Sequence, residues 1–356
     1  MIRVLVAEDS ATARALLVSI LASAPDIVVV GEARTGTEAV AMAEQLEPDL
    51  ITMDVQMPEL GGLEATRQIM TRSPRPILVV SSAANTDVEL SLEATRAGAL
   101  MVIAKPQGAQ SPLFESDRRQ LLSMVRALAQ VKVVRRHGTP ISSRAQEGQT
   151  PSGPFAMPRA RHAPTDSLEV LAIAASTGGP AALKLILSAL PRTFPLPILV
   201  VQHIARGFSQ GLAHWLNGDS QLHVKIAELS EPAEAGTVYV APDDRHLGVK
   251  RDKQGVLRIQ LDNAPPVGTF RPSASYLFQS CAENVGRGVL ALILTGMGDD
   301  GVAGLRRVRQ ASGRILAQDE ASSVIFGMPR EAQRAGVVDQ VVALEDIPRR
   351  LRELTS

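Results

Sequence analysis

Short apolar runs alternate with amphipathic segments over the first 130 residues. Five runs have the length of strands, and the segments between them carry apolar residues at helical spacing. The expected strands are 2–7, 27–30, 50–53, 77–80 and 100–104. The expected helices between them are 11–22, 37–46, 63–71 and 88–97. This alternation predicts five βα units, and hence a doubly wound parallel sheet with helices on both faces.

The same alternation resumes after residue 167. Strand-like runs cover 170–174, 198–202, 238–240, 289–294 and 315–317. Helical periodicity covers 180–190, 301–310 and 331–335. A second α/β domain built on a parallel sheet is therefore expected.

Between the two halves, the stretch 135–166 contains five prolines among Gly, Ser and Arg, with few large apolar residues. Such a composition cannot bury enough surface to offset the entropy of ordering, so we predict a flexible linker. The expected organisation is a domain over 1–130, a linker over 131–166 and a domain over 167–356.

Composition narrows the class of protein. Lys and Arg together number 37, as do Asp and Glu, so no overall basic field favours nucleic acid. Cys281 is the only cysteine, which excludes an internal disulfide and fits a reducing compartment. The chain shows neither a signal-peptide pattern nor an apolar run of membrane-spanning length. We expect a cytoplasmic protein that is not inserted in a membrane.

Three carboxylates follow the predicted strands of the first domain. Glu8 and Asp9 come after the first strand and Asp54 after the third. The carboxyl ends of parallel strands meet at one edge of the sheet, where ligands bind. Clustered carboxylates repel one another unless a cation intervenes, and all-oxygen ligation suits Mg²⁺.

Two further polar residues end neighbouring strands. Lys105 follows the fifth strand and is one of only six lysines among 37 basic residues. A compact ammonium suits contact with a phosphate as a point charge. Ser81, after the fourth strand, adds a hydroxyl. Each residue taken singly is better explained as a helix cap, but the combination indicates a phosphoryl site.

The first domain resembles a response-regulator receiver domain. The resemblance covers residues 1–130 and rests on these motifs: Glu8-Asp9, Asp54-Val55-Gln56-Met57-Pro58, Gly61-Gly62-Leu63, Ser81 and Lys105-Pro106. It implies that Asp54 accepts a phosphoryl group from a histidine kinase. It also implies that Mg²⁺ is held by Asp9, Asp54 and the backbone carbonyl of Gln56. Glu8 replaces the commoner Asp and adds one methylene to that potential ligand.

In the second domain, the strand at 170–174 leads to Ser176 and then to Thr177-Gly178-Gly179-Pro180, where a helix can begin. We expect a serine at such a turn to be well exposed. The glycines allow close backbone approach, and free amides at a helix N-terminus favour an oxyanion. If the motif stood alone, Ser176 or Thr177 would more simply be a helix cap.

A serine nucleophile needs a base, and His203 ends the strand at 198–202. Two other histidines, His137 and His162, lie in the expected linker. His214 and His223 fall in a helix and a strand, and His246 follows Asp243-Asp244-Arg245 in what we expect to be a surface loop. His203 is therefore the preferred base.

The third component is a carboxylate that orients the imidazole. The strand at 289–294 ends in Thr295-Gly296-Met297-Gly298-Asp299-Asp300-Gly301, and the spacing does not choose between the two aspartates. The order Ser, His, Asp differs from that of α/β-hydrolases, chymotrypsin and subtilisin, and Ser176 lacks a Gly-x-Ser-x-Gly elbow.

The second domain instead resembles the catalytic domain of the CheB family of chemotaxis protein-glutamate methylesterases, over residues 168–352. The motifs are Ala175-Ser176-Thr177-Gly178-Gly179, Val201-Gln202-His203, Leu294 to Gly301 and Phe326-Gly327-Met328-Pro329-Arg330. The resemblance implies Ser176 as nucleophile, His203 as base and Asp300 as its partner, with the Met297 backbone near the oxyanion. Asp299 stands where relatives often have Asn. Phe270, ahead of Arg271-Pro272-Ser273, replaces a commoner polar residue.

Together the two resemblances imply a phosphorylation-regulated serine esterase. Its substrates would be glutamate γ-methyl esters on chemoreceptor helices, with deamidation of receptor glutamines as a second activity. We expect a monomer whose unphosphorylated receiver covers the catalytic cleft, with no cofactor for the esterase reaction. The alternative is a phosphorylation-dependent scaffold with an inactive hydrolase-like domain, and the intact serine, histidine and aspartate set argues against it.

Overall fold

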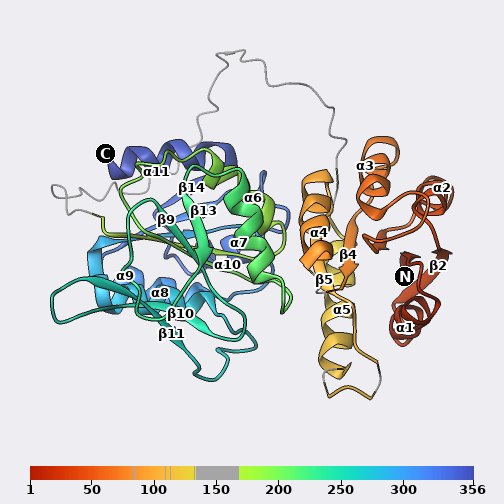
Figure 1. Ribbon diagram of the computed structural model, residues 1–356, viewed down its shortest axis with the longest axis horizontal. Coiled ribbons are helices and arrows are strands. Elements are labelled where there is room, and N and C mark those ends of the chain that lie inside the picture. Colours follow the sequence, from red (N-terminus) through yellow and green to blue (C-terminus); the bar gives the residue numbers. More distant parts are fainter. Residues whose placement is uncertain (83–84, 109, 113, 132, 134–167) are drawn as a thin grey trace, which may run out of the picture.

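The computed structural model describes residues 1–82, 85–108, 110–112, 114–131, 133 and 168–356 (Figure 1). The predicted linker at 131–166 falls outside these ranges except for residues 131 and 133. The described chain forms two parallel-sheet halves, as the alternation of apolar runs predicts.

The N-terminal half contains a five-stranded sheet of order β2-β1-β3-β4-β5, in which all pairs are parallel. Its strands are β1 (Ile2–Ala7), β2 (Ile27–Ala33), β3 (Leu50–Met53), β4 (Ile77–Ser81) and β5 (Met101–Ala104). Its helices are α1 (Ala11–Ala22), α2 (Gly36–Leu46), α3 (Gly62–Arg72), α4 (Asn85–Ala97) and α5 (Phe114–Leu128). The predicted doubly wound (βα)5 architecture is confirmed, and α5 supplies the last helix.

Alternate residues of the inner strand β1 explain why helices cover both faces. Val4 and Val6 pack with apolar residues of α1 and α5, such as Leu121. Leu5 and Ala7 point the other way and belong to the core beneath α2 and α3. Side chains of a strand alternate between faces, so a strand that is apolar and buried from Val4 to Ala7 needs helices on both faces of the sheet.

The C-terminal half is built on a seven-stranded parallel sheet of order β14-β13-β12-β6-β7-β9-β8. Its strands are β6 (Val170–Ala175), β7 (Ile198–Gln202), β8 (His223–Ile226), β9 (Thr237–Val240), β12 (Val289–Ile293), β13 (Arg314–Gln318) and β14 (Gln340–Val342). Its α-helices are α6 (Gly179–Ser188), α7 (Ser209–Gly218), α8 (Ala274–Val285), α9 (Val302–Gln310), α10 (Met328–Arg334) and α11 (Ile347–Thr355).

The prediction of a parallel sheet omits the antiparallel hairpin of β10 (His246–Arg251) and β11 (Leu257–Asp262), and it also omits the edge strand β14. In β11, Leu257, Ile259 and Leu261 are buried and alternate with less buried residues. This alternation is the sequence signal of a half-buried strand. The hairpin packs with α8 and α9 against one face of the sheet.

The order in which strands are added to the sheet changes side between β6 and β12, which makes this position a topological switch point. Strands β7, β9 and β8 lie on one side of this point, and β13 and β14 lie on the other. In open α/β sheets the crevice at such a switch point is the usual ligand site. The fold therefore places a site where β12, β6 and β7 end side by side.

The two halves meet through one edge of the receiver sheet. Figure 1 shows α4, β5 and α5 turned toward the C-terminal half, and α4 packs against α6 and α7. In the described residues, no helix is both long and apolar enough to span a bilayer.

Candidate active site

Ser176 follows β6 and begins the turn into α6. Its amide donates to the carbonyl of Thr295 over 3.0 Å, and its carbonyl accepts from the Gly179 amide over 2.8 Å. Gly178 has a φ of 78°, in the left-handed region that favours glycine. The turn is therefore held on both sides, and Ser176 lies at the carboxyl edge of the sheet.

Ser176 is only 6% exposed, so the prediction that it is well exposed is wrong. The cover comes from β5 of the receiver half. There Met101 reaches the turn, and the Thr177 hydroxyl donates to its Sδ atom over 3.5 Å. A serine at a strand-to-helix turn is open only when nothing packs on the edge of the sheet, and sequence does not reveal such packing.

His203 follows β7, the neighbour of β6, and its amide donates to the Ala175 carbonyl over 2.9 Å. Its Nε2 atom lies 3.0 Å from Oδ2 of Asp300. A carboxylate only accepts, so Nε2 carries the proton. The other nitrogen, Nδ1, is buried and has no hydrogen-bond partner among the described residues. Nδ1 therefore keeps a free lone pair that can accept a proton.

Asp300 is held by the N-terminus of α8. Its Oδ1 accepts from the Ser273 hydroxyl (2.8 Å) and the Ser275 amide (3.0 Å), and its Oδ2 accepts from the Ala274 amide (2.7 Å). Helix N-termini stabilise negative charge. Burial alone would raise the pKa of Asp300, but His203 and the Ser275 amide outweigh it and lower that pKa to about 2.

The two adjacent aspartates are thereby distinguished by their surroundings. Asp299 is exposed at the rim of the cleft, whereas Asp300 is buried beside His203. Asp300 does not cap the following helix, because Gly301 stands at the N-cap of α9.

Backbone amides near Ser176 are the candidates for an oxyanion site. Within the described residues, the amides of Thr177 and Met297 have no hydrogen-bond acceptor, and Met297 lines the cleft with Ser176. The Gly179 amide already donates a hydrogen bond to the Ser176 carbonyl. Gly179 has a packing role instead, since a Cβ atom there would lie 2.0 Å from Oε1 of Gln202.

Gln202 and Phe270 shape the site, although no site role was predicted for them. The Gln202 side-chain amide donates to the carbonyls of Ser176 and His203, each over 2.8 Å, and so ties the nucleophile turn to the base. The Phe270 ring stacks on the imidazole of His203, with ring centroids 4.1 Å apart and planes 10° from parallel. Two features of the sequence could have pointed to these roles. Gln202 belongs to the motif Val201-Gln202-His203, and Phe270 is an aromatic residue at a position where relatives commonly have a polar one.

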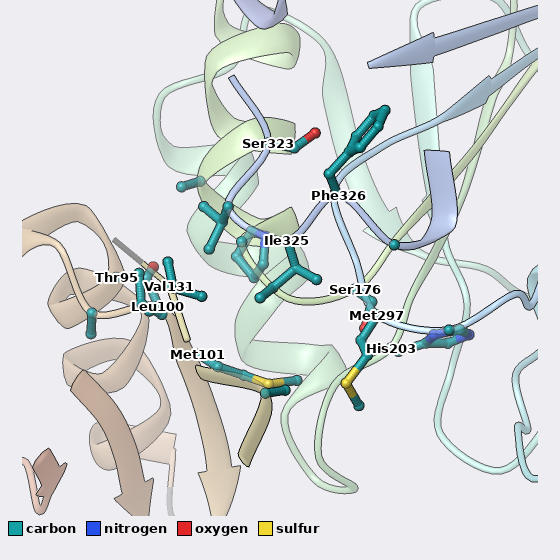
Figure 2. Close-up of a pocket in the computed structure, with 18 of the residues that line it drawn as sticks. Thr95, Leu100, Met101, Val131, Ser176, His203, Met297, Ser323, Ile325 and Phe326 are labelled. Carbon is teal, nitrogen blue, oxygen red and sulfur yellow. The ribbon is translucent and has the colours of Figure 1, made fainter. Parts of the chain in front are cut away.

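The cleft between the two halves has a volume of about 1060 Å³ and is lined by Ser176 and His203, among others. Figure 2 shows Thr95, Leu100 and Met101 of the receiver on one side and Met297, Ile325 and Phe326 on the other. The predicted motif at 326–330 closes this second side, where the Gly327 and Met328 amides both donate to the Gly296 carbonyl.

A second contact between the halves joins α4 to α7. The indole N–H of Trp215 donates to Oε1 of Glu93 over 2.7 Å. Arg96 lies 3.6 Å from Oδ2 of Asp219, the same oxygen that pairs with Lys184 at 2.9 Å. We call the Trp215–Glu93 and Arg96–Asp219 pairs the α4–α7 latch.

The acidic cluster of the receiver half forms where β1 and β3 end. One carboxylate oxygen each from Glu8, Asp9 and Asp54 lies within 4.8 Å of the others. Lys105 donates to Oε1 of Glu8 over 2.9 Å and to Oδ2 of Asp54 over 2.8 Å. The geometry brings the predicted carboxylates and ammonium together.

The cluster carries more negative charge than Lys105 neutralises. Burial raises the pKa of both Glu8 and Asp54 despite their hydrogen bonds to Lys105. The two carboxylates in turn raise the pKa of Lys105 against the opposing effect of its burial. Oε2 of Glu8 is buried with no partner among the described residues. An unsatisfied buried carboxylate oxygen in an all-oxygen cluster fits a hard divalent cation.

Three other residues complete this region. Ser81 ends β4, and its buried hydroxyl has no acceptor or donor within the described chain. The Gln56 amide donates to Oδ1 of Asp54 over 3.4 Å, and its side chain is exposed. Arg14, which was not predicted, donates from Nη1 to the carbonyls of Glu8 and Asp9 and so holds the acidic loop.

Among the described residues, no histidine other than His203 lines the cleft that contains Ser176. His137 and His162 fall outside the described residues. His214 lies in α7, and His223 begins β8 and is exposed. The expected surface loop at His246 is wrong: this residue begins β10 and is completely buried.

Comparison with known proteins agrees with this geometry. A sequence model of the response regulator receiver domain matches residues 4–114, and that of CheB methylesterase matches residues 171–351. The protein-glutamate methylesterase/protein-glutamine glutaminase 4 of Myxococcus xanthus is 52% identical over 98% of this chain and 96% of its own length. The corresponding enzyme of Thermotoga maritima is 38% identical over 99% of this chain and 98% of its own length.

A solved structure extends the likeness to the fold. The crystal structure of the Thermotoga maritima CheB methylesterase catalytic domain superimposes with a TM-score of 0.52 and 40% identity. It covers 53% of this chain and 99% of that domain. With a receiver half, a catalytic half and full-length relatives at this identity, the chain belongs to the CheB methylesterase family.

Proposed function

We propose that this protein hydrolyses glutamate γ-methyl esters on chemoreceptor helices, and deamidates receptor glutamines, under control of receiver phosphorylation. The observation that carries the proposal is the His203–Asp300 pair, whose free Nδ1 lies in the same cleft as Ser176. Family membership supplies the substrate class, because the full-length relatives carry both activities in their names.

In the first half-reaction, Nδ1 of His203 takes the proton of the Ser176 hydroxyl as its oxygen attacks the ester carbonyl. Asp300 stabilises the imidazolium that forms, because its carboxylate is already fixed by three donors of α8. Negative charge develops on the carbonyl oxygen, which the amides of Met297 and Thr177 can stabilise. His203 then returns the proton to the departing oxygen, and methanol leaves an acyl-enzyme.

In the second half-reaction, water replaces methanol. His203 takes a proton from the water as it attacks the acyl carbon, and then gives that proton back to Ser176. The products are glutamate and free enzyme. With glutamine as substrate the same steps release ammonia. Every proton moves between groups of the chain, the substrate and water.

Regulation acts through the cover on Ser176. We infer that phosphorylation of Asp54 moves Ser81 and the α4–β5–α5 edge, withdraws Met101 and opens the latch. Glu8, Asp9 and Asp54, with the Gln56 carbonyl, would hold the Mg²⁺ that supports transfer from a histidine kinase. The cation would neutralise charge on the incoming phosphoryl group, and Lys105 would contact a phosphoryl oxygen.

Methanol release from methylated receptor membranes tests the proposal. Wild type should release methanol faster with a small phosphodonor, Asp54→Ala should show only the basal rate, and Ser176→Ala should release none in either condition. Turnover by Ser176→Ala would contradict the nucleophile assignment. Absence of turnover in the wild type would instead favour the scaffold alternative.

A further inference from the structure

His246 is a buried histidine that the proposed reaction does not use. It begins β10 and is completely buried, yet both of its ring nitrogens have partners. The Ser273 amide donates to Nδ1 over 3.2 Å, and Nε2 lies 3.1 Å from the carbonyl of Pro265. A buried imidazole with two defined partners occupies one orientation.

These partners fix the tautomer of His246. The Ser273 amide is a donor, so Nδ1 must be the unprotonated acceptor. The Pro265 carbonyl is an acceptor, so Nε2 must carry the proton. The ring is therefore neutral, and it offers a lone pair to the first residue before α8.

Ser273 links His246 to the catalytic carboxylate. Among the described residues, the Asp300 carboxylate accepts three hydrogen bonds from residues 273–275 and another from Nε2 of His203. The Ser273 amide faces His246 while its hydroxyl faces Asp300. A shift of the Ser273 backbone would therefore move the donors that hold Asp300.

Packing around His246 reinforces this link. Its ring stacks on Tyr276 of α8 with centroids 4.6 Å apart, and the Tyr276 hydroxyl donates to Oδ2 of Asp262 over 2.8 Å. Asp262 is the residue of β11 paired with His246 in the hairpin. The hairpin thus contacts the N-terminal end of α8 through the stacked ring of His246 and through two hydrogen bonds, one to His246 and one to Asp262.

We propose that His246 is a positioning residue of the esterase reaction, which holds the N-terminus of α8 so that Asp300 meets His203. This inference rests on the proposed function. Its consequence is kinetic, because a displacement of about 1 Å in a catalytic group can lower the rate about 10²-fold while substrate contacts stay the same. The loss should fall on kcat and leave KM near its wild-type value.

Two substitutions separate positioning from mere packing. Asn places its Oδ1 atom near the site of Nδ1, so His246→Asn keeps an acceptor for the Ser273 amide. Gln places its side-chain amide near the site of Nε2, so His246→Gln keeps the donor to Pro265 and loses that acceptor. We expect His246→Asn to retain kcat within about 5-fold and His246→Gln to lose about 10- to 100-fold, with KM unchanged in both. His223→Gln, at an exposed histidine, is the matched control and should match the wild type.

The double variant His246→Gln/Asp300→Asn gives a readout that packing alone would not move. If His246 acts through Asp300, adding His246→Gln to Asp300→Asn should cause no further loss of kcat, because the effects of coupled residues are not additive. The inference would be overturned if the losses of kcat from His246→Gln and Asp300→Asn multiplied in the double variant. It would also be overturned if His246→Asn and His246→Gln had equal kcat. These outcomes differ from failure of the proposed function, in which the wild type itself would be inactive.

A measurement on the unsubstituted protein covers the case in which a variant does not fold. In the full chain labelled with ¹⁵N-histidine, the Nδ1 resonance of His246 should be that of an unprotonated acceptor and its Nε2 that of a protonated nitrogen. A proton on Nδ1 would exclude the bond from Ser273 and contradict the inference.

Discussion

The two halves of the molecule place carboxylates at the same kind of sheet edge but balance their charge in opposite ways. In the receiver half, Glu8 and Asp54 share the ammonium of Lys105, Asp9 lies beside them, and burial raises the pKa of Glu8 and Asp54. In the catalytic half, Asp300 has three donors from α8 besides His203, and its pKa is lowered to about 2.

This difference separates a switch from a fixed catalyst. An acidic cluster with an unsatisfied oxygen gains stability when a cation or a modification changes its charge, so it is sensitive to both. A carboxylate whose oxygens are all bonded stays ionised and in place, which a base partner requires. The carboxyl edge of the sheet therefore serves regulation in the receiver half and catalysis in the catalytic half.

The largest effect should follow loss of charge on the fixed carboxylate. Asp300→Asn keeps the shape of the side chain but offers an amide where Nε2–H needs an acceptor, so the histidine tautomer reverses. We expect kcat to fall about 10⁴-fold, as measured by methanol release. Asp299→Asn is the matched control, because Asp299 is adjacent and exposed. An equal loss in both variants would show that the comparison is wrong.

Loss of charge in the switch should act on regulation instead. Asp54→Asn removes the phosphoryl acceptor, so the phosphodonor response should disappear while basal activity remains. Because Asp54 is buried among like charges, the variant should unfold at a temperature no lower than the wild type. A large drop in basal kcat or in Tm would contradict this expectation.

The two sites should also respond to acid with opposite signs. The lowered pKa of Asp300 contributes stability that is present above the unfolded value of 3.8 and is lost as pH falls through about 2. This contribution is about 2 kcal/mol, to be measured as the difference in unfolding free energy between wild type and Asp300→Asn.

For Glu8 the sign is reversed. Its pKa is raised in the folded protein, so its ionised form opposes folding at neutral pH, and the opposition fades as pH falls through the raised value. Glu8→Gln should therefore gain most in unfolding free energy over the wild type at neutral pH, and the gain should shrink as the pH falls through the raised pKa of Glu8. A gain that grows on acidification would refute the assignment of unbalanced charge to this cluster.

The smallest effect concerns the α4–α7 latch, which connects the two halves of the molecule. Trp215→Phe removes the indole donor to Glu93 and keeps an aromatic ring in α7. We expect basal activity to rise a few-fold, because one part-buried hydrogen bond contributes about 0.5–1.5 kcal/mol and other contacts remain. Glu115→Gln, at an exposed ion pair of α5, is the control and should leave the basal rate unchanged. An unchanged rate in Trp215→Phe would remove the latch from the account.

Much of the fold was predictable because it depends on local patterns. Buried parallel strands are uninterrupted apolar runs, and β1, β3 and β7 begin and end where those runs do. Residues at the ends of neighbouring strands, such as Ser176 and His203, then meet without further information. The strand β11 was missed because its side chains alternate between buried and less buried positions instead of forming an apolar run.

What sequence could not show depends on contacts across the chain. The burial of Ser176 requires Met101 from the other half, and the choice between Asp299 and Asp300 requires the N-terminus of α8. His246 follows two aspartates and an arginine, a pattern typical of a surface loop, yet the stack on Tyr276 buries it. Tertiary contacts between distant segments decided each of these positions.

Labelling of Ser176 by a serine-directed phosphonate tests the central claim most directly, because it requires an activated nucleophile and an open cover. In the full chain we predict slow labelling at Ser176 that accelerates when a small phosphodonor and Mg²⁺ are added. Asp54→Asn should keep the slow rate, and Ser176→Ala should not label. A labelling rate that is the same with and without phosphodonor, or modification at another residue, would contradict the claim that the receiver covers an active serine.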